Sequence, residues 1–229
     1  MMRHFWLAFI TLAVTVCSAQ QRDDLANAVK QGRTFEVRDL IARGVNLNKG
    51  DYSASTCGNW YLPEATLLMV GVSCDQYEIV DILISSGAKL NHLTNDDYTC
   101  LALAVSNRNL RMLNLLLNRG ATLNAAYQAL MLASEQGYNE IIGALLDRGM
   151  YVNYEDAHYR TPLLYAAKTG QTDTCRYLLE KGADIDRVTN YGMTPLAWAA
   201  YNNHLETYRF LLGRGASKKF CVYPMCNTN

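Results

Sequence analysis

The amino-acid sequence predicts an all-α solenoid of six stacked helix–turn–helix repeats. The first observation is a glycine that follows a leucine-rich run six times, at intervals of 43, 33, 29, 33 and 33 residues. The second is the position 21 residues before each glycine, which reads Thr-Pro-Leu at 161–163 and at 194–196. The third is size, because units this small cannot bury an apolar face alone and must stack. The six glycines are Gly44, Gly87, Gly120, Gly149, Gly182 and Gly215.

Each element of a unit has a local cause. Thr161 and Thr194 are N-cap residues, and the proline after each fits the first turn of a helix. A helix of small residues follows, as at 196–200. A turn near Gly170 then leads to a second, amphipathic helix that includes 174–179. The glycine at the end of the unit closes this second helix in the left-handed conformation.

Composition and charge exclude several classes of protein. Half of the 229 residues are hydrophobic, 18% are charged and only 4 are proline, which excludes a disordered or collagen-like chain. Lys+Arg and Asp+Glu both number 21, so the net charge is zero. Bulk charge therefore gives no reason to expect a nucleic acid or an anionic membrane surface as partner.

Residues 1–19 have the pattern of a secretory signal peptide. Arg3 precedes an apolar run at 5–16, and the small residues Cys17, Ser18 and Ala19 form a cleavage site. The run is too short to span a bilayer, which takes about 20 helical residues. We expect export and no membrane insertion after cleavage; an uncleaved anchor or a buried N-terminal helix is the alternative. The predicted domains are 1–19 (signal peptide), 20–220 (repeat domain) and 221–229 (tail).

The compartment after export is less sharply indicated. The chain beyond residue 19 has 18 asparagines, and none begins an Asn-x-Ser/Thr sequon. A glycosylating secretory pathway would tolerate such sequons, so their absence favours a bacterial periplasm, with an extracellular location as the alternative.

Repeats five and six resemble the ankyrin repeat. Residues 160–170, Arg-Thr-Pro-Leu-Leu-Tyr-Ala-Ala-Lys-Thr-Gly, follow the family pattern with the usual histidine replaced by Leu164, and 177–186 match it almost throughout. Repeat six matches similarly, with 190–193 as its finger tip, while repeats one to four keep the spacing and the glycine. The resemblance covers roughly 22–217. It implies an ankyrin-repeat solenoid with β-hairpin fingers, and a monomer when free.

Two intervals depart from the period. The first contains ten residues beyond 33, around 50–65, which predicts one enlarged finger carrying Trp60 and Tyr61. Insertions in repeat proteins map to loops, often on the binding face. Alternatively, these aromatic side chains fold back onto the neighbouring finger bases. The 29-residue interval indicates that repeat four has lost most of its finger, at Ala125 and Ala126.

The resemblance implies a protein that binds a partner protein through its fingers and the exposed side of its first helices. Tyrosine, arginine and methionine at these positions are typical of interface cores; stacking of the tyrosines on neighbouring fingers is the alternative. We interpret Tyr165 and Trp198, at the buried leucine position, as core residues. The candidate partner-binding residues are Tyr98, Tyr127, Arg160, Tyr191, Met193, Tyr201, Asp96, Asn107, Glu135, His158 and Lys168, together with Trp60 and Tyr61 of the insertion.

Acidic residues gather in repeats three to five. They could steer a basic partner through complementary fields, or they could form an ordinary solvated face. The group comprises Asp96, Asp97, Glu135, Glu155 and Asp156.

The cysteines are interpreted as disulfides and core thiols rather than a metal site, because the tight Cys/His spacing of a metal site is absent. A bridge from Cys57 to Cys74 or to Cys100 would pin the enlarged finger. Cys221 and Cys226 could form a local bridge in the tail, and Cys175 is expected to be a free core thiol.

The sequence contains no motif of a catalytic or cofactor site. It lacks a His-Glu-x-x-His motif, a phosphate-cradling glycine loop and a Gly-x-Ser-x-Gly elbow. We therefore expect no enzyme activity, no cofactor and no metal. Two roles remain open for an exported binding protein: a periplasmic immunity or inhibitor protein that neutralises a secreted toxin, or a secreted effector or envelope adaptor. An enzyme with an unrecognised site is the third, least favoured class.

Overall fold

The structure is a computed structural model that describes residues 20–48, 52, 57, 64–95, 98–123 and 127–220. Several predictions fall outside these residues and stay predictions. They are the signal peptide at 1–19, Trp60 and Tyr61 of the insertion, Asp96 and Asp97, the shortened finger at Ala125 and Ala126, and the tail cysteines Cys221 and Cys226.

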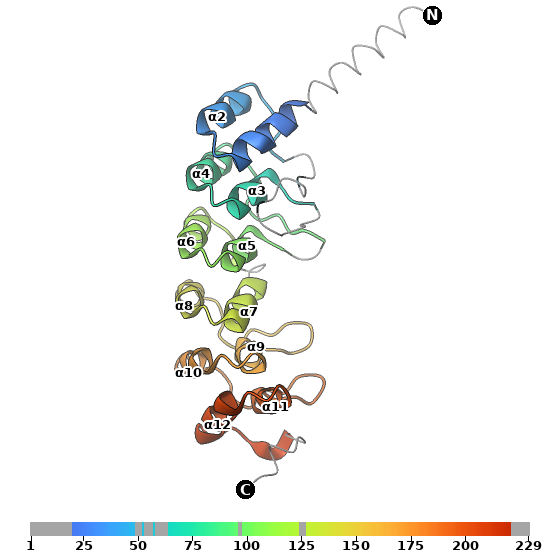
Figure 1. Cartoon of the computed structure of the whole chain (residues 1–229), viewed down its shortest axis with the longest axis vertical. Coiled ribbons are helices and arrows are strands. Elements are labelled where there is room, and N and C mark those ends of the chain that lie inside the picture. The colour runs from blue at the N-terminus through green and yellow to red at the C-terminus, as the bar shows by residue number, and fades with distance from the viewer. Residues whose placement is uncertain are drawn as a thin grey trace, which may run out of the picture. The chain divides into compact units, whose positions relative to one another are not determined.

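The described residues are helical wherever they have regular secondary structure, which confirms the all-α prediction (Figure 1). Residues 20–30 form a first helix. The helices that follow are α2 (Thr34–Ala42), α3 (Leu67–Ser73), α4 (Tyr77–Ser85), α5 (Cys100–Ser106), α6 (Leu110–Asn118), α7 (Tyr127–Gln136), α8 (Asn139–Asp147), α9 (Pro162–Lys168), α10 (Thr172–Glu180), α11 (Pro195–Tyr201) and α12 (Leu205–Gly213), with a short 3-10 turn η3 (Lys218–Phe220).

The helix boundaries lie where the sequence signals place them. The hydroxyls of Thr161 and Thr194 accept hydrogen bonds from the amides of Leu164 and Ala197, at 3.4 and 3.2 Å. At the other end of each unit the six recurring glycines all have positive φ, as at Gly182 (89°). These caps satisfy backbone groups that the helix itself leaves unpaired.

The expected β-hairpin fingers are tight turns, because no described residue lies in a strand. In finger 5 (151–160) the amide of Asp156 donates to the carbonyl of Arg160 at 3.1 Å, and the amide of Tyr159 donates to the carbonyl of Asp156 at 2.9 Å. Finger 6 (184–193) repeats the pattern between Thr189 and Met193 at 3.0 Å. Each turn is too short to extend into a ladder of strand pairs.

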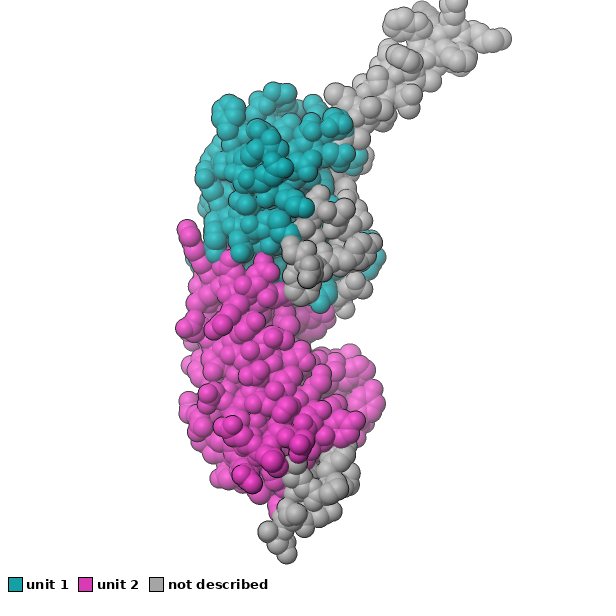
Figure 2. All heavy atoms as spheres, viewed as in Figure 1, with its two compact units in different colours: residues 1–104, 115–121 teal, residues 105–114, 122–229 magenta. Residues whose placement is uncertain are grey.

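The contacts divide the chain into two compact units (Figure 2). Unit 1 comprises residues 1–104 and 115–121, and unit 2 comprises 105–114 and 122–229. In unit 1, α4 packs against both α2 and α3. In unit 2, α7, α9 and α11 pack side by side, and α10 packs against α9 and α12 (Figure 1).

Side-chain tethers fix the ends of the first helices in unit 2. Thr169 and Gln171 both donate to the carbonyl of Glu135, at 2.8 and 3.3 Å. One repeat later, Asn202 donates to the carbonyl of Lys168 at 3.0 Å, and His204 contacts the same carbonyl at 3.0 Å. Consecutive repeats are therefore held in a fixed register at Glu135 and Lys168, whose side chains are candidate site residues.

Candidate partner-binding surface

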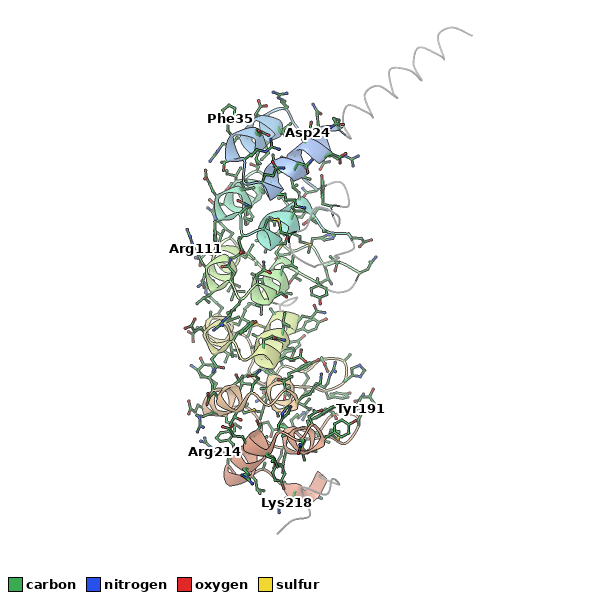
Figure 3. The ribbon with its side chains drawn as sticks, in the orientation of Figure 1. Asp24, Phe35, Arg111, Tyr191, Arg214 and Lys218 are labelled. Carbon is green, nitrogen blue, oxygen red and sulfur yellow. A yellow bond between two sulfur atoms is a disulfide. The ribbon has the colours of Figure 1, made fainter. Side chains whose placement is uncertain are left out.

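Four tyrosines among the described residues of unit 2 are exposed. Tyr151, at the start of finger 5, is 65% exposed and lies beside the C-terminal ends of α8 and α10. The other three are Tyr159, Tyr191 and Tyr201. Tyr159 lies in finger 5, Tyr191 in finger 6 and Tyr201 at the end of α11, and their exposed fractions are 52%, 70% and 58%. Figure 3 shows Tyr191 among the loops of unit 2, whereas Arg214 lies beside α12 on the other side. We call these three tyrosines, together with Arg160 and Lys168, the finger surface.

Asp156 organises the base of finger 5. Its Oδ1 accepts from the amides of His158 and Arg160 at 2.8 and 3.0 Å, and its Oδ2 accepts from Arg160 Nε at 2.6 Å and from the Tyr165 hydroxyl at 2.9 Å. Burial on its own raises the pKa of Asp156, but these hydrogen bonds together outweigh it and hold the pKa below its ordinary value. The carboxylate thus ties the finger to helix α9.

We expected Tyr165 in the core, and this prediction is wrong, because the residue is only half-buried. Its hydroxyl donates a hydrogen bond to Asp156 in finger 5. Burial, and then the hydrogen bond to Asp156, raise the pKa of Tyr165. The Arg160 guanidinium carbon lies 5.0 Å from the ring centroid and the Lys168 ammonium nitrogen 5.8 Å from it. Two cations therefore share one aromatic ring.

The described acidic residues do not form a free acidic face. Asp156 pairs with Arg160, and Glu135 pairs with Lys168 at 3.3 Å. Glu155 pairs with Arg187 at 2.6 Å. The sequence could not show these pairings, because two of them join groups about one repeat apart in the chain. The steering of a basic partner by this cluster finds no support here.

Finger 6 places aromatic side chains beside those of finger 5. The rings of His158 and Tyr191 lie 5.8 Å apart, and the amide of Asn190 donates to the carbonyl of His158 at 3.3 Å. On α11, Trp198 meets Tyr201 edge-on at 5.7 Å. Trp198, like Tyr165, is half-buried rather than fully buried.

The structure does not bring all the predicted residues together. Tyr98 belongs to unit 1, where its amide donates to the Thr94 hydroxyl at 3.0 Å. Asn107 is half-buried in the turn between α5 and α6. Tyr127 stacks on Tyr154 with ring centroids 5.6 Å apart and planes at 10°, the arrangement that the stacking alternative describes. Met193 is half-buried at the base of finger 6.

The sequence analysis did not select Tyr159 as a candidate residue. It also did not predict that Arg160 and Lys168 would lie against the ring of Tyr165. Tyr159 lies 33 residues before Gly192, so an alignment of the two fingers would have shown an aromatic residue at a glycine position. No sequence signal could have revealed the contact between Tyr165 and Asp156, which depends on how the finger folds back on α9.

The structure joins Cys57 and Cys74 in a disulfide with their Cα atoms 5.0 Å apart. Cys100 was the alternative partner; it is a free thiol, 1% exposed at the start of α5, so its place among the disulfide candidates is not supported. Cys175 is a free thiol in the core, as expected. The bridge attaches the inserted segment to the end of α3.

A shallow hollow of about 440 Å³ lies beside finger 6, lined by Tyr159, Asp184, Asp186, Arg187, Val188, Thr189 and Asn190. Within the described ranges, no three His, Cys, Asp or Glu side chains are grouped as metal ligands. Nor does any helix in the described part of the chain combine the length and apolarity needed to cross a bilayer.

Comparison with known proteins identifies the repeat. A family profile described as "Ankyrin repeats (3 copies)" matches residues 25–127, 68–156 and 130–220. Similar curated proteins are an ankyrin repeat domain-containing protein of cowpox virus (36% identical over 66 residues), a putative ankyrin repeat protein of fowlpox virus (27% over 138) and an ankyrin repeat and KH domain-containing protein of Caenorhabditis elegans (30% over 124). The matches cover 28%, 60% and 52% of this chain, but only 10%, 19% and 4% of those proteins.

Solved structures agree on the fold. The ankyrin repeat domain of human ASB11 superposes with a TM-score of 0.71 at 27% identity, covering 85% of each chain. An ankyrin repeat domain from Acinetobacter baumannii AYE superposes with a TM-score of 0.69 at 24% identity, covering 84% of this chain and 98% of the other, a likeness that concerns the fold alone.

Proposed function

The chain belongs to the ankyrin repeat family, and from that premise we propose that it binds a partner protein through the finger surface of unit 2 and performs no catalysis. The observation that carries the proposal is the exposure of Tyr159, Tyr191 and Tyr201, each more than half exposed, in the fingers and at the end of α11 in unit 2. Tyrosine is enriched in interface cores because it adds contact area and a polar group at little cost in side-chain entropy.

The surface is also held ready for binding. Asp156 fixes Arg160 and the turn of finger 5, and the tethers on the carbonyls of Glu135 and Lys168 fix the helix ends. A partner that docks here meets side chains that are already positioned, so less conformational entropy is lost on association.

Export is part of the proposal. The pattern at 1–19 is that of a signal peptide, and the bridge between Cys57 and Cys74 is of a kind that persists in oxidising compartments. Together these features support a periplasmic or extracellular location, with the periplasm favoured by the absence of sequons.

The role that fits an exported binding protein without a catalytic motif is neutralisation of a specific partner, as an immunity or inhibitor protein acting on a secreted toxin. The alternative is an effector or envelope adaptor. The neighbouring gene distinguishes these two roles. A toxin gene beside this one supports the immunity role, whereas the absence of a neighbouring toxin gene across related genomes supports the adaptor role.

The binding surface is tested by capture from the native envelope fraction, using mature protein and a Tyr159→Ala/Tyr191→Ala/Tyr201→Ala variant. The control carries three substitutions at exposed residues of α10 and α12 in the same unit, Arg176→Ala, Leu205→Ala and Arg209→Ala. We expect the native protein and the control to capture the same partner and the finger variant to lose it. Equal capture by all three proteins contradicts the assignment of the surface.

A further inference from the structure

Three ion pairs of unit 2, two in the fingers and one between α7 and α9, share an asymmetry of exposure. Side-chain exposure is 31% for Arg160 against 10% for Asp156, 35% for Lys168 against 28% for Glu135, and 43% for Arg187 against 26% for Glu155. In every pair the cation is the more exposed partner. These three ion pairs therefore present their positive ends to solvent.

Two of these three cations lie against the ring of Tyr165. Arg160 and Lys168 both lie over it, at 5.0 and 5.8 Å from the centroid. Arg160 uses Nε for Asp156, and no described residue accepts a hydrogen bond from its two terminal nitrogens. Those nitrogens are the part of a guanidinium that pairs with a carboxylate in two parallel hydrogen bonds.

Asp156 cannot itself take up these donors. Its two oxygens already accept four hydrogen bonds, from His158, Arg160 and Tyr165. Asp156 thus holds Arg160 at Nε, while the two terminal nitrogens of Arg160 have no acceptor among the described residues. The Tyr165 hydroxyl donates to the same carboxylate and keeps it in position. The terminal nitrogens of Arg160, whose side chain is 31% exposed, are therefore open to solvent or to a partner.

We propose that Arg160 and Lys168 form a carboxylate receptor that recognises an acidic segment of the partner polypeptide that also carries apolar side chains. A carboxylate of this segment pairs with the terminal nitrogens of Arg160, and the Lys168 ammonium at the same ring adds a second positive charge. Apolar residues of the segment pack on Tyr191 and Tyr201. This inference rests on the proposed function, because it names the chemistry of the partner for the same finger surface. It reverses the expectation of a basic partner.

The test is selection from a random displayed 12-residue peptide library on the mature protein, followed by affinities of the enriched peptides made synthetically with amidated C-termini. The variants are Arg160→Gln/Lys168→Gln, the charge-preserving Arg160→Lys/Lys168→Arg, and a control, Arg176→Gln/Arg209→Gln, that removes two cations from the outer helices. Circular dichroism melts check that each variant is folded.

We expect enriched peptides to be rich in Asp and Glu. Their binding should weaken about fivefold to tenfold in the Gln variant, a change appropriate to two partly exposed charge contacts. The charge-preserving variant should bind about threefold to fivefold more weakly, because a lysine at position 160 cannot form two parallel hydrogen bonds with a carboxylate. The outer-helix control should bind within about twofold of the native protein. Raising salt from 50 to 300 mM should weaken binding, because exposed charge pairs are screened.

The failures are distinguishable. Enriched peptides that are neutral or basic, acidic peptides that bind the Gln variant unchanged, or no enrichment at all would overturn the carboxylate receptor. If binding is nevertheless lost in Tyr191→Ala/Tyr201→Ala, the finger surface stands and only its charge preference fails. Peptides that bind every variant equally contradict both proposals.

Discussion

Tyr159 and Gly192 occupy the same position in two consecutive fingers, and both have positive φ, 58° and 74°. Each closes its turn by donating its amide to the carbonyl three residues earlier, at 2.9 Å to Asp156 and 3.0 Å to Thr189. Glycine adopts this conformation freely, whereas a tyrosine there is strained by about 1 kcal/mol. The Tyr159 side chain is 52% exposed, so its burial offsets little of this strain. An exposed aromatic ring at this position therefore lowers the stability of finger 5.

Replacing Tyr159 by asparagine should separate stability from binding. Asparagine tolerates the left-handed conformation better than tyrosine, so Tyr159→Asn should leave the free energy of unfolding unchanged or raise it by up to about 1 kcal/mol. Gly192→Ala should lower it by about 1 kcal/mol for the converse reason. Urea unfolding of both variants measures this, and a destabilised Tyr159→Asn would show that the ring supports the finger.

The Asp156 carboxylate should stabilise the protein in a pH-dependent way. The folded pKa lies below the ordinary value of 3.8, so the contribution is fully present above about pH 5 and is lost as the pH falls through the lowered folded pKa. Asp156→Asn should cost about 1–2 kcal/mol at pH 7, because charge-assisted hydrogen bonds are lost. The difference between native and variant should shrink below pH 4 in thermal melts, and a constant difference would contradict this account.

The disulfide between Cys57 and Cys74 closes a loop with a sequence separation of 17. A loop of this size stabilises the folded chain by about 3 kcal/mol through the unfolded state. Cys57→Ser/Cys74→Ser should lower the free energy of unfolding by that order, and dithiothreitol should then have no further effect. Non-reducing peptide mass spectrometry should recover the two cysteines as one linked species, and recovery as separate thiols removes the bridge from the account.

Cys100 and Cys175 should be unreactive in the folded protein. Both are buried, and burial raises the pKa of each thiol from 9.0 to about 12. Since the thiolate is the reactive form, iodoacetamide at pH 8 should leave both unmodified until the chain is unfolded in guanidinium. Peptide mass spectrometry reads each site, and modification of either in the native state would show that its repeat opens locally.

The repeat period and the capping residues made the fold predictable. Thr161 and Thr194 begin helices, and the glycines that recur about every 33 residues end them, because these signals act within one turn of the chain. The site was less accessible to sequence reasoning. The ion pair between Lys168 and Glu135 joins neighbouring repeats. The sequence does not show which partner of such a pair is the more exposed.

The position of Tyr165 illustrates the same limit. Its helix position is that of a buried leucine, so its size and place favoured the core. The hydroxyl instead finds an acceptor in Asp156, and a hydroxyl without a partner would be costly to bury. The residue therefore stays half-buried, where it supports Arg160 and Lys168.

The central claim is that the partner contacts the fingers of unit 2. Site-specific photo-crosslinking tests it most directly, with p-benzoylphenylalanine placed at Tyr191 in one variant and at Arg209 of α12 in another, each irradiated in the native envelope fraction. The account predicts one discrete crosslinked partner from position 191 and none from position 209. A crosslink from position 209 alone, or from neither position, would contradict it.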